Sequence, residues 1–271
     1  MKICILGGTG QLGNELNKVL QHQEIYSFGK KDFDITNLEE SYKRLRVIDP
    51  EVIIHAAAYT NVDGCEKKQD VAQQVNVEGT ENIAKISERI GSRLIYISSD
   101  YVFDGEKETP YDEGDQPNPI NVYGKTKYAG ELEVMKNTDK HFIVRTAWLY
   151  GHKGKNFIQT VLNLATSKTL LNVVDDQRGC PTYALDLAAA LGELTKLDDY
   201  GIYHLVNEGN CTWYELADTI CRCKKLSAKV NPIKTTELNQ KAPRPKNSSL
   251  SNNSSIKMRD WQEAVESFLK S

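Results

Sequence analysis

The chain has 271 residues with a formal net charge of -3, and 39% of its residues are hydrophobic and 26% charged. This length and composition suit a globular chain that buries a large core, either as one domain or with a smaller lobe. The charge and the lack of a basic tract exclude an obvious nucleic-acid partner, and no apolar run approaches the roughly 20 residues that span a bilayer. An apolar strand stands where a secretory leader would be, so we expect no membrane contact and a cytoplasmic location.

Strand-like and helix-like segments alternate through the first half of the chain. In chain order we expect strand 2–6, helix 11–21, strand 24–28, helix 37–48, strand 52–56, helix 70–90, strand 93–98, a proline-containing loop at 104–121, a helix that carries Tyr123 and Lys127, and strand 141–145. This alternation predicts an α/β fold, a Rossmann-type doubly wound parallel sheet with helices on both faces.

The regular alternation of strands and helices ends past residue 150. Helices are expected near 155–167, 183–196 and 212–223, and the polar segment 239–255 is interpreted as a surface loop or a mobile lid. The six cysteines show no metal-ligand spacing, so we predict reduced thiols and no metal site.

Glycines follow the first strand with the spacing G-x-x-G-x-x-G, at Gly7, Gly10 and Gly13. Glycine permits positive φ and lets backbone N–H groups approach phosphates closely. Gln11 and Leu12 then fall where the N-terminus of the next helix would face a pyrophosphate. The pattern predicts a dinucleotide site, and the alternative is an ordinary glycine turn of another α/β protein.

The end of strand 24–28 bears on the choice of cofactor. An acidic residue there would favour NAD, but the chain continues with Gly29, Lys30 and Lys31. Lys30 is in place to meet a 2′-phosphate, so we expect NADPH, with NADH as the alternative cofactor; equally, both lysines could be no more than solvated loop residues. Further cofactor contacts are expected from Asp34, Ile35, Ala57, Ala58 and Tyr59.

A tyrosine and a lysine four residues apart, Tyr123 and Lys127, share one face of a helix at a separation of about 6 Å. A phenol beside an ammonium can pass a proton while a nicotinamide passes a hydride. Ser99 follows strand 93–98, at the sheet edge where ligands bind. Together with the glycine loop, these residues predict a redox enzyme with Ser99, Tyr123 and Lys127 as its catalytic group.

These motifs resemble those of the dTDP-4-dehydrorhamnose reductase family, within the extended short-chain dehydrogenase/reductase superfamily. The resemblance covers nearly the whole chain. Its matching segments are 7–13, 57–63, 76–80, 99–105, 123–127, 145–150, 156–157, 176–182 and 242–245 with Ser248.

The resemblance implies that NADPH reduces the 4-keto group of dTDP-4-dehydro-L-rhamnose. Tyr123 would be the general acid, Lys127 would bond the nicotinamide ribose and lower the phenol pKa, and Ser99 would polarise the carbonyl. Implied substrate contacts are Asp100, Trp148, Arg178 and Arg244, although either arginine could instead be a surface residue.

The resemblance also bears on assembly and on the domains. Some relatives bind magnesium through glutamates at a dimer interface; Glu15 sits at one such position, but Leu185 replaces the second glutamate. A homodimer is therefore left open, without a bridging metal. We expect an NADP-binding domain over 1–150, joined by 183–198, and a smaller discontinuous substrate-binding lobe within 151–271.

Two other classes of function compete with the reductase. The first is another nucleotide-sugar enzyme of the superfamily. An epimerase would use the same three residues, whereas a dehydratase would carry an Asp-Glu pair where this chain has Asp100 and Tyr101. The second is a non-catalytic subunit that resembles the regulatory partner of methionine adenosyltransferase.

Overall fold

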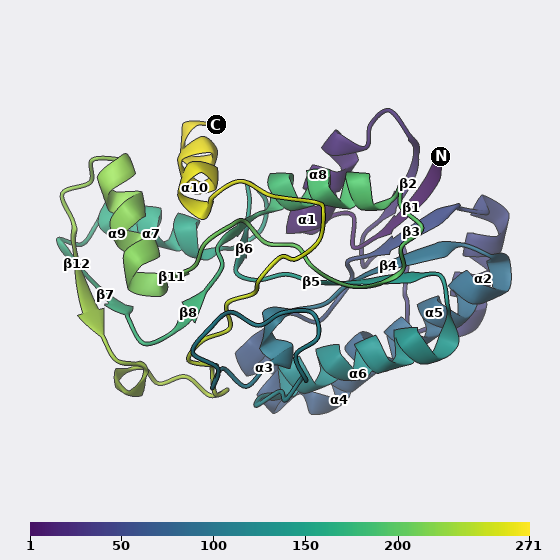
Figure 1. Ribbon diagram of the computed structural model, residues 1–271, viewed down its shortest axis with the longest axis horizontal. Helices are drawn as coiled ribbons and strands as arrows, with labels where there is room; N and C mark the ends of the chain where they lie inside the picture. Colours follow the sequence, from purple (N-terminus) through teal and green to yellow (C-terminus); the bar gives the residue numbers. More distant parts are fainter.

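Short apolar runs form the strands of a central six-stranded sheet in the computed structural model, which describes residues 1–271 (Figure 1). All neighbouring strands pair in parallel. Their spatial order is β2 (Glu24–Phe28), β1 (Lys2–Leu6), β3 (Val52–His55), β4 (Arg93–Ile97), β5 (His141–Arg145) and β10 (Gly201–His204). The chain order reverses between β1 and β3, and such a switch point opens a crevice for ligands at the carboxyl ends of the strands. The predicted fold class is confirmed.

Alternate residues of each strand bury into two different cores. Ile3 and Ile5 of β1 pack with the helices α1 (Gln11–Val19) and α8 (Ala184–Leu194) on one face. Cys4 and Leu6 face the opposite core. The helices on that side are α2 (Leu38–Ile48), α5 (Gly79–Ile90) and α6 (Val122–Asn137). Figure 1 shows these two helix layers above and below the sheet.

The predicted helix 70–90 is present but is not a uniform α-helix. It starts as α4 (Gln69–Gln73), widens into the π-helical segment η1 (Gln74–Glu78) and continues as α5. A short helix before it, α3 (Val62–Lys67), was not predicted. The Asn61 side chain caps α3 by accepting a hydrogen bond from the Gly64 N–H at 2.8 Å. Caps of this kind stabilise helices too short to show a hydrophobic period.

A smaller lobe lies at the left of the sheet in Figure 1. The expected helices 155–167 and 212–223 are confirmed as α7 (Phe157–Ala165) and α9 (Trp213–Cys223), and α10 (Trp261–Lys270) follows near the C-terminus. The lobe contains short strand pairs: β6 (Leu149–Tyr150) with β9 (Thr182–Tyr183), β7 (Leu170–Val174) with β12 (Lys229–Ile233), and β8 (Arg178–Gly179) with β11 (Cys211–Thr212). Its own core gathers large side chains, including Tyr150, Tyr183, Trp261 and Phe268.

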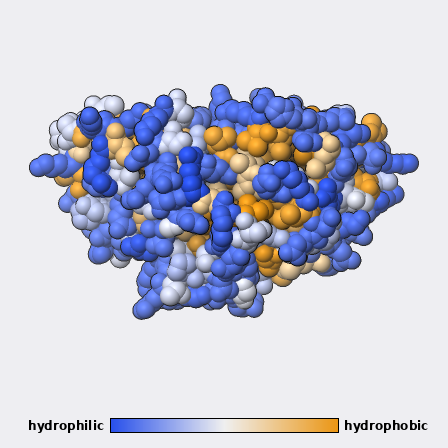
Figure 2. Space-filling view, turned by 45° about the horizontal axis from the view of Figure 1, so that its top comes forward, coloured by the Kyte–Doolittle hydropathy of each residue, from blue (hydrophilic) through white to orange (hydrophobic).

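The chain returns to the main sheet after it has begun the lobe. The expected helix 183–196 is confirmed as α8, which packs with α1, and β10 then adds the sixth strand beside β5. The proposed division into two domains stays a prediction. No helix has the length and apolar character needed to cross a bilayer. Polar side chains cover most of the face in Figure 2, and apolar ones gather toward its centre and right.

The polar segment 239–255 contains no helix and only isolated bridges. Residues 241–251, which we call the strap, lie against the loop that carries Tyr111 and against β8. The Tyr111 N–H donates to the Ser249 carbonyl at 2.8 Å, and the Ser251 N–H donates to the Tyr111 carbonyl at 2.7 Å. The Ser248 N–H donates to the Arg178 carbonyl at 2.8 Å. These bonds hold the strap on the side of the molecule where β4 and β8 end.

Candidate active site

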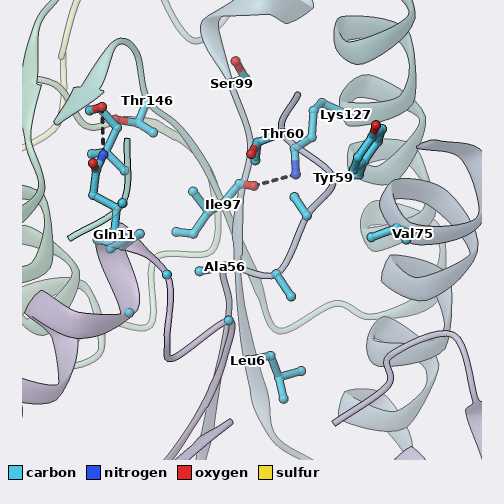
Figure 3. Close-up of a pocket in the computed structure, with 18 of the residues that line it drawn as sticks. Leu6, Gln11, Ala56, Tyr59, Thr60, Val75, Ile97, Ser99, Lys127 and Thr146 are labelled. Carbon is cyan, nitrogen blue, oxygen red and sulfur yellow. Dashed lines mark hydrogen bonds between the residues drawn. The ribbon is translucent and has the colours of Figure 1, made fainter. Parts of the chain in front are cut away.

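A cavity of about 770 Å³ opens at the carboxyl ends of β1, β3 and β4 (Figure 3). It brings together most of the residues predicted from the sequence. Those that line it are Gly7, Gly10, Gln11, Leu12, Gly13, Lys30, Asp34, Ile35, Ala57, Ala58, Tyr59, Ser99, Asp100, Tyr123, Lys127 and Trp148.

The glycine loop forms one end of the cavity. Gly7 has a φ of +91°, and a Cβ there would lie 2.8 Å from the Ala56 carbonyl. A Cβ on Gly13 would lie 2.4 Å from the Gly7 oxygen, so the helix could not approach the loop. α1 begins after Gly10 without a side-chain cap and without an acidic residue in its first turn. Its uncapped N–H groups and positive dipole end suit a pyrophosphate.

The Gln11 side chain makes hydrogen bonds to other parts of the protein at both ends of its amide. Its Nε2 donates to the Leu149 carbonyl at 2.8 Å, and its Oε1 accepts from Asn156 Nδ2 at 3.3 Å. Because both ends of the amide are used, the backbone N–H is the group that Gln11 can offer to a ligand. The side chain ties α1 to the segment that leads into the lobe.

The end of β2 carries two lysines, and the nearby Asp32 carboxylate accepts from the Gly29 N–H at 3.3 Å and does not line the cavity. Lys30 is exposed and lines the cavity, whereas Lys31 does not. Sequence reasoning did not identify Arg44 of α2, whose guanidinium lies over the Phe28 ring at 4.8 Å and over the Phe33 ring at 5.2 Å. The arginine is four residues before the end of α2, and nothing in its spacing pointed to the end of β2.

Asn76 fixes the loop that follows β3. Its Oδ1 accepts from the Tyr59 N–H at 2.7 Å, and its Nδ2 donates to the Tyr59 carbonyl at 3.2 Å and to Thr126 Oγ1 at 3.1 Å. Asn76 is buried in the π-helical segment, so the wide turn of η1 faces both the loop and α6. One buried amide therefore holds the wall at Ala57, Ala58 and Tyr59 against the helix that bears Tyr123.

Asn121 caps the helix that bears the tyrosine and the lysine, accepting from the Gly124 N–H at 2.8 Å. Tyr123 sits in the first turn, where its ring meets the edge of Tyr101 at a centroid distance of 5.9 Å. Burial raises the pKa of the Tyr123 phenol, and a hydrogen bond with Ser99 opposes that shift. The phenol is thus protonated at neutral pH, as a general acid must be.

Lys127 is 1% exposed and lies below Tyr123 on the same helix face. Its Nζ donates to the Ile97 carbonyl at 2.8 Å (Figure 3) and lies 4.1 Å from the centre of the Tyr96 ring. Burial lowers the pKa of Lys127 to about 7, and the Glu131 carboxylate one turn further on opposes that shift. The ammonium is directed at the end of β4 and makes no hydrogen bond to the Tyr123 phenol.

Ser99 and Asp100 form a hydrogen-bonded pair at the end of β4. The Ser99 hydroxyl donates to Asp100 Oδ1 at 3.0 Å and accepts from the Tyr101 N–H at 3.2 Å. Asp100 is 3% exposed, and its Oδ2 accepts from the Ser248 hydroxyl at 2.5 Å. Burial raises the pKa of Asp100 to about 7, although the two serine hydrogen bonds oppose it.

Two stacked indoles form the wall on the side of the lobe. Trp148 has a φ of +45° and stacks on Trp213 at 3.4 Å with an interplanar angle of 4°. Gly179 makes room behind it, because a Cβ there would lie 2.4 Å from the Trp148 ring. Trp213 also lines the cavity and donates from Nε1 to Gln177 Oε1 at 3.2 Å. Trp213 was missed by sequence reasoning, since it belongs to none of the matching segments.

The two arginines predicted to contact substrate do not line the cavity. Arg178 Nη1 donates to Asn210 at 2.9 Å, and its Nη2 lies 3.6 Å from Glu215. Arg244 Nη1 donates to Asp63 Oδ1 at 2.9 Å. Substrate contact by either arginine remains a prediction that this geometry does not support.

The fold and the cavity together define a class of protein. A parallel sheet with a glycine-rich turn after β1, and a serine, a tyrosine and a lysine at the ends of β4 and α6, is the arrangement of nucleotide-dependent reductases and epimerases. Over residues 1–271 the chain matches the family model described as the RmlD substrate binding domain, and it belongs to that family.

Similar proteins agree with this assignment and with the resemblance inferred from the motifs. The chain is 39% identical to the spore coat polysaccharide biosynthesis protein SpsK of Bacillus subtilis, covering 99% of this chain and 97% of that one. It is 37% identical to the dTDP-4-dehydrorhamnose reductase of Escherichia coli K12, with the same coverage. The crystal structure of dTDP-4-dehydrorhamnose reductase from Bacillus anthracis in complex with NADP superposes with a TM-score of 0.97 at 42% identity, covering 100% of this chain and 99% of that one.

Proposed function

We propose that the protein uses NADPH to reduce the 4-keto group of dTDP-4-dehydro-L-rhamnose, giving dTDP-L-rhamnose. The observation that carries the proposal is the single cavity that joins the glycine loop to Ser99, Tyr123 and Lys127. Relatives over nearly the full length are named dTDP-4-dehydrorhamnose reductases, and one was crystallised with NADP.

The residues present fit the cofactor. A side chain at Gly7 would collide with the Ala56 carbonyl and one at Gly13 with the Gly7 oxygen, so the tight turn that lets a diphosphate approach α1 and its uncapped N–H groups needs glycine at both positions. Lys30 lines the cavity at the end of β2 and the Asp32 carboxylate does not, so this end of the cavity suits a 2′-phosphate better than a pair of ribose hydroxyls. Asp34 and Ile35 line the same end of the cavity, where an adenine would lie.

When bound, NADPH supplies the hydride that goes to C4 of the sugar. Tyr123 holds the proton for the alkoxide that forms, and it lies in the same cavity as Ser99. Lys127 commits one of its three N–H bonds to the Ile97 carbonyl and keeps two for ribose hydroxyls. Its positive charge favours the phenolate, which lowers the cost of the proton transfer.

Ser99 orients the substrate carbonyl from the end of β4. Its single proton, which Asp100 Oδ1 accepts in this structure, would turn to the carbonyl oxygen and supply part of the charge stabilisation that an oxyanion needs. The Trp148 and Trp213 pair offers an apolar face to the sugar nucleotide, and Trp148 Nε1 is free to donate one hydrogen bond. The homodimer and the cytoplasmic location expected from the sequence stay predictions; light scattering after size-exclusion chromatography tests the first.

The test is oxidation of NADPH, followed by its absorbance, with enzymatically generated dTDP-4-dehydro-L-rhamnose and an NADH control. We expect turnover, dTDP-L-rhamnose as the product and a preference for NADPH. Tightly bound, non-exchanging NAD in the purified protein would favour an epimerase instead. NADPH binding without turnover, together with a stable synthetase partner in a pull-down, would favour the regulatory subunit.

A further inference from the structure

Three lysines line the cavity, and the reaction proposed above uses two of them. Lys30 lies at the end of β2, at the place proposed for the 2′-phosphate, and Lys127 is buried on α6, where it is proposed to bond the ribose. The third is Lys155, an exposed residue of the loop 151–156 that follows β6. An ammonium without a role, in a cavity proposed to receive diphosphate groups, is a candidate anion contact.

The loop that carries Lys155 lies against the first residue of α1. A Cβ on Gly151 would lie 3.1 Å from Gln11 Cγ, and one on Gly154 would lie 3.9 Å from Gln11 Cβ. Asn156 holds the loop in this position, donating from Nδ2 to the Gly151 carbonyl at 2.7 Å and to Gln11 Oε1 at 3.3 Å. Lys155 is therefore held beside the N-terminus of α1.

The Lys155 ammonium has no anionic partner within the protein, since it takes part in none of the ion pairs of the chain. Two carboxylates line the cavity, and both accept hydrogen bonds from other residues: Asp34 from Thr36 at 2.7 Å, and Asp100 from Ser99 at 3.0 Å. The first turn of α1 has no acidic residue. The charge of Lys155 thus adds to the positive end of the α1 dipole, and no carboxylate in that turn neutralises it.

We propose that Lys155 binds the diphosphate of the dinucleotide cofactor. The inference rests on the proposed function, which places that diphosphate at the glycine loop and the N-terminus of α1. Residues 7–13 offer backbone N–H groups but no cationic side chain, so Lys155 supplies the charge that they lack. The sugar nucleotide also carries a diphosphate, but the contact between the Lys155 loop and Gln11 places the ammonium on the cofactor side.

The test measures the binding of three adenine nucleotides to the full chain, by titration without the sugar substrate. NADPH and NADH both carry a diphosphate, whereas adenosine 2′-monophosphate has none. Lys155→Ala should weaken both dinucleotides about 5-fold, as for the loss of an exposed charge pair, and leave adenosine 2′-monophosphate unchanged. Lys155→Arg should stay close to the wild type because it keeps the charge.

Two other lysines provide matched controls. Lys153 is exposed in the same loop but does not line the cavity, so Lys153→Ala should bind all three nucleotides as the wild type does. Lys30→Ala should show the opposite selectivity, weakening NADPH and adenosine 2′-monophosphate but not NADH. The loss in Lys155→Ala should shrink at about 1 M NaCl, because salt screens an exposed charge pair. A loss that persists there would reflect a change in loop shape and would overturn the charge contact.

The remaining outcomes separate this inference from the proposed function. Unchanged dinucleotide binding in Lys155→Ala would overturn the contact, and so would an equal loss in Lys153→Ala or for adenosine 2′-monophosphate. A loss confined to dTDP, titrated separately, would overturn it in favour of the sugar-nucleotide diphosphate. A wild type that binds both dinucleotides but does not reduce the keto sugar would overturn the proposed reaction, while the titrations would still decide the contact. A wild type that binds neither dinucleotide would overturn both.

Discussion

The parallel sheet and the smaller lobe are built in opposite ways. In the sheet, β1 to β5 follow one another with helices between them, and each strand pairs with a neighbour or near neighbour in the chain. In the lobe, β7 pairs with β12 and β8 with β11, and each pair skips strands that lie between its members in the chain. The sheet holds the glycine loop and the acid in fixed relation, whereas the lobe supplies Trp213 and the strap from segments far apart in the chain.

The two regions also treat charge differently. Below the catalytic helix face, Glu131 and Arg145 form an ion pair at 2.7 Å with both side chains almost fully buried. In the lobe, the pair of Arg222 and Asp218 has a similar distance of 2.8 Å but is largely exposed. A buried pair cannot lose one partner without leaving the other charge in the core. The proposed catalytic residues of α6 therefore lie beside a buried ion pair in which substitution of either partner should be costly.

The largest effect is expected from Tyr123→Phe. This substitution removes the proposed general acid, which lies on α6 against the sheet. We expect kcat to fall about 1,000-fold because the proton donor is lost. NADPH binding should persist, since the ring keeps its edge contact with Tyr101. Single-turnover kinetics and a fluorescence titration with NADPH measure the two properties. Near-normal turnover would mean that another group donates the proton.

Arg145→Met tests the contrast between the two ion pairs. It should lower the free energy of unfolding by about 3 kcal/mol because Glu131 stays buried without its partner. The matched lobe variant, Arg222→Met, should cost less than about 1 kcal/mol. Urea unfolding at one pH compares them, and equal losses would remove the distinction. The double variant Glu131→Gln with Arg145→Met should recover part of the loss.

Lys127→Met tests whether burial of the Lys127 ammonium lowers the free energy of unfolding of the wild type. The folded pKa of Lys127 is about 7, below the ordinary value of 10.5, so between these pH values the unfolded chain binds more protons than the folded one. Wild-type stability therefore gains from this group as the pH rises through that range. The variant should exceed the wild type by a few kcal/mol below pH 7, and the gap should close toward pH 10.5. Urea unfolding across pH measures the gap, and a pH-independent difference would contradict the burial argument.

The same lysine variant should lose both NADPH affinity and turnover, because its ammonium is proposed to bond the ribose. Cofactor titration and steady-state kinetics distinguish these two losses. A purely kinetic loss would contradict the ribose contact.

Trp213→Ala probes the lobe side of the cavity. Without its stacking partner, Trp148 should hold the sugar nucleotide less firmly, and the KM for that substrate should rise about 10-fold. Tyr214→Ala, the next residue on α9, is the control because Tyr214 does not line the cavity. Steady-state kinetics with each substrate varied in turn decide the point. A rise confined to the KM for NADPH would assign the indole pair to the cofactor instead.

The smallest effect is expected at the end of β2. Lys30→Ala should weaken NADPH binding about 5-fold, as for the loss of an exposed charge pair, and leave NADH binding unchanged. Lys31→Ala should change neither, since Lys31 does not line the cavity. Titrations with both cofactors give the answer, and equal effects of the two lysines would point to general electrostatics rather than a phosphate contact.

Much of the sheet could be predicted because buried parallel strands form short apolar runs. The runs at 2–6 and 52–56, and the glycines between strand and helix, have local causes that a sequence displays. The π-helical turn at Asn76 does not, because it depends on hydrogen bonds to Tyr59 and Thr126 from other elements.

The candidate site was predictable to the same extent. Residues whose role follows from strand ends and helix spacing, such as Ser99, Tyr123 and Lys127, do line one cavity. Arg178 shows where such prediction stops. A matching segment identifies the residue but does not give the direction of its side chain, and the Arg178 guanidinium contacts Asn210 and Glu215. Trp213 was missed for a related reason: its stack with Trp148 joins segments that only the folded lobe brings together.

The position of β10 in the chain has a consequence for synthesis on the ribosome. β5 can form as soon as residue 145 has emerged, but its outer neighbour comes at Gly201–His204, after α7 and β7 of the lobe. During that interval the nascent sheet presents β5 as an open edge, the kind of edge along which other chains can pair. α8 and β10 therefore close the growing sheet, and translation must pass residue 204 before that edge is protected.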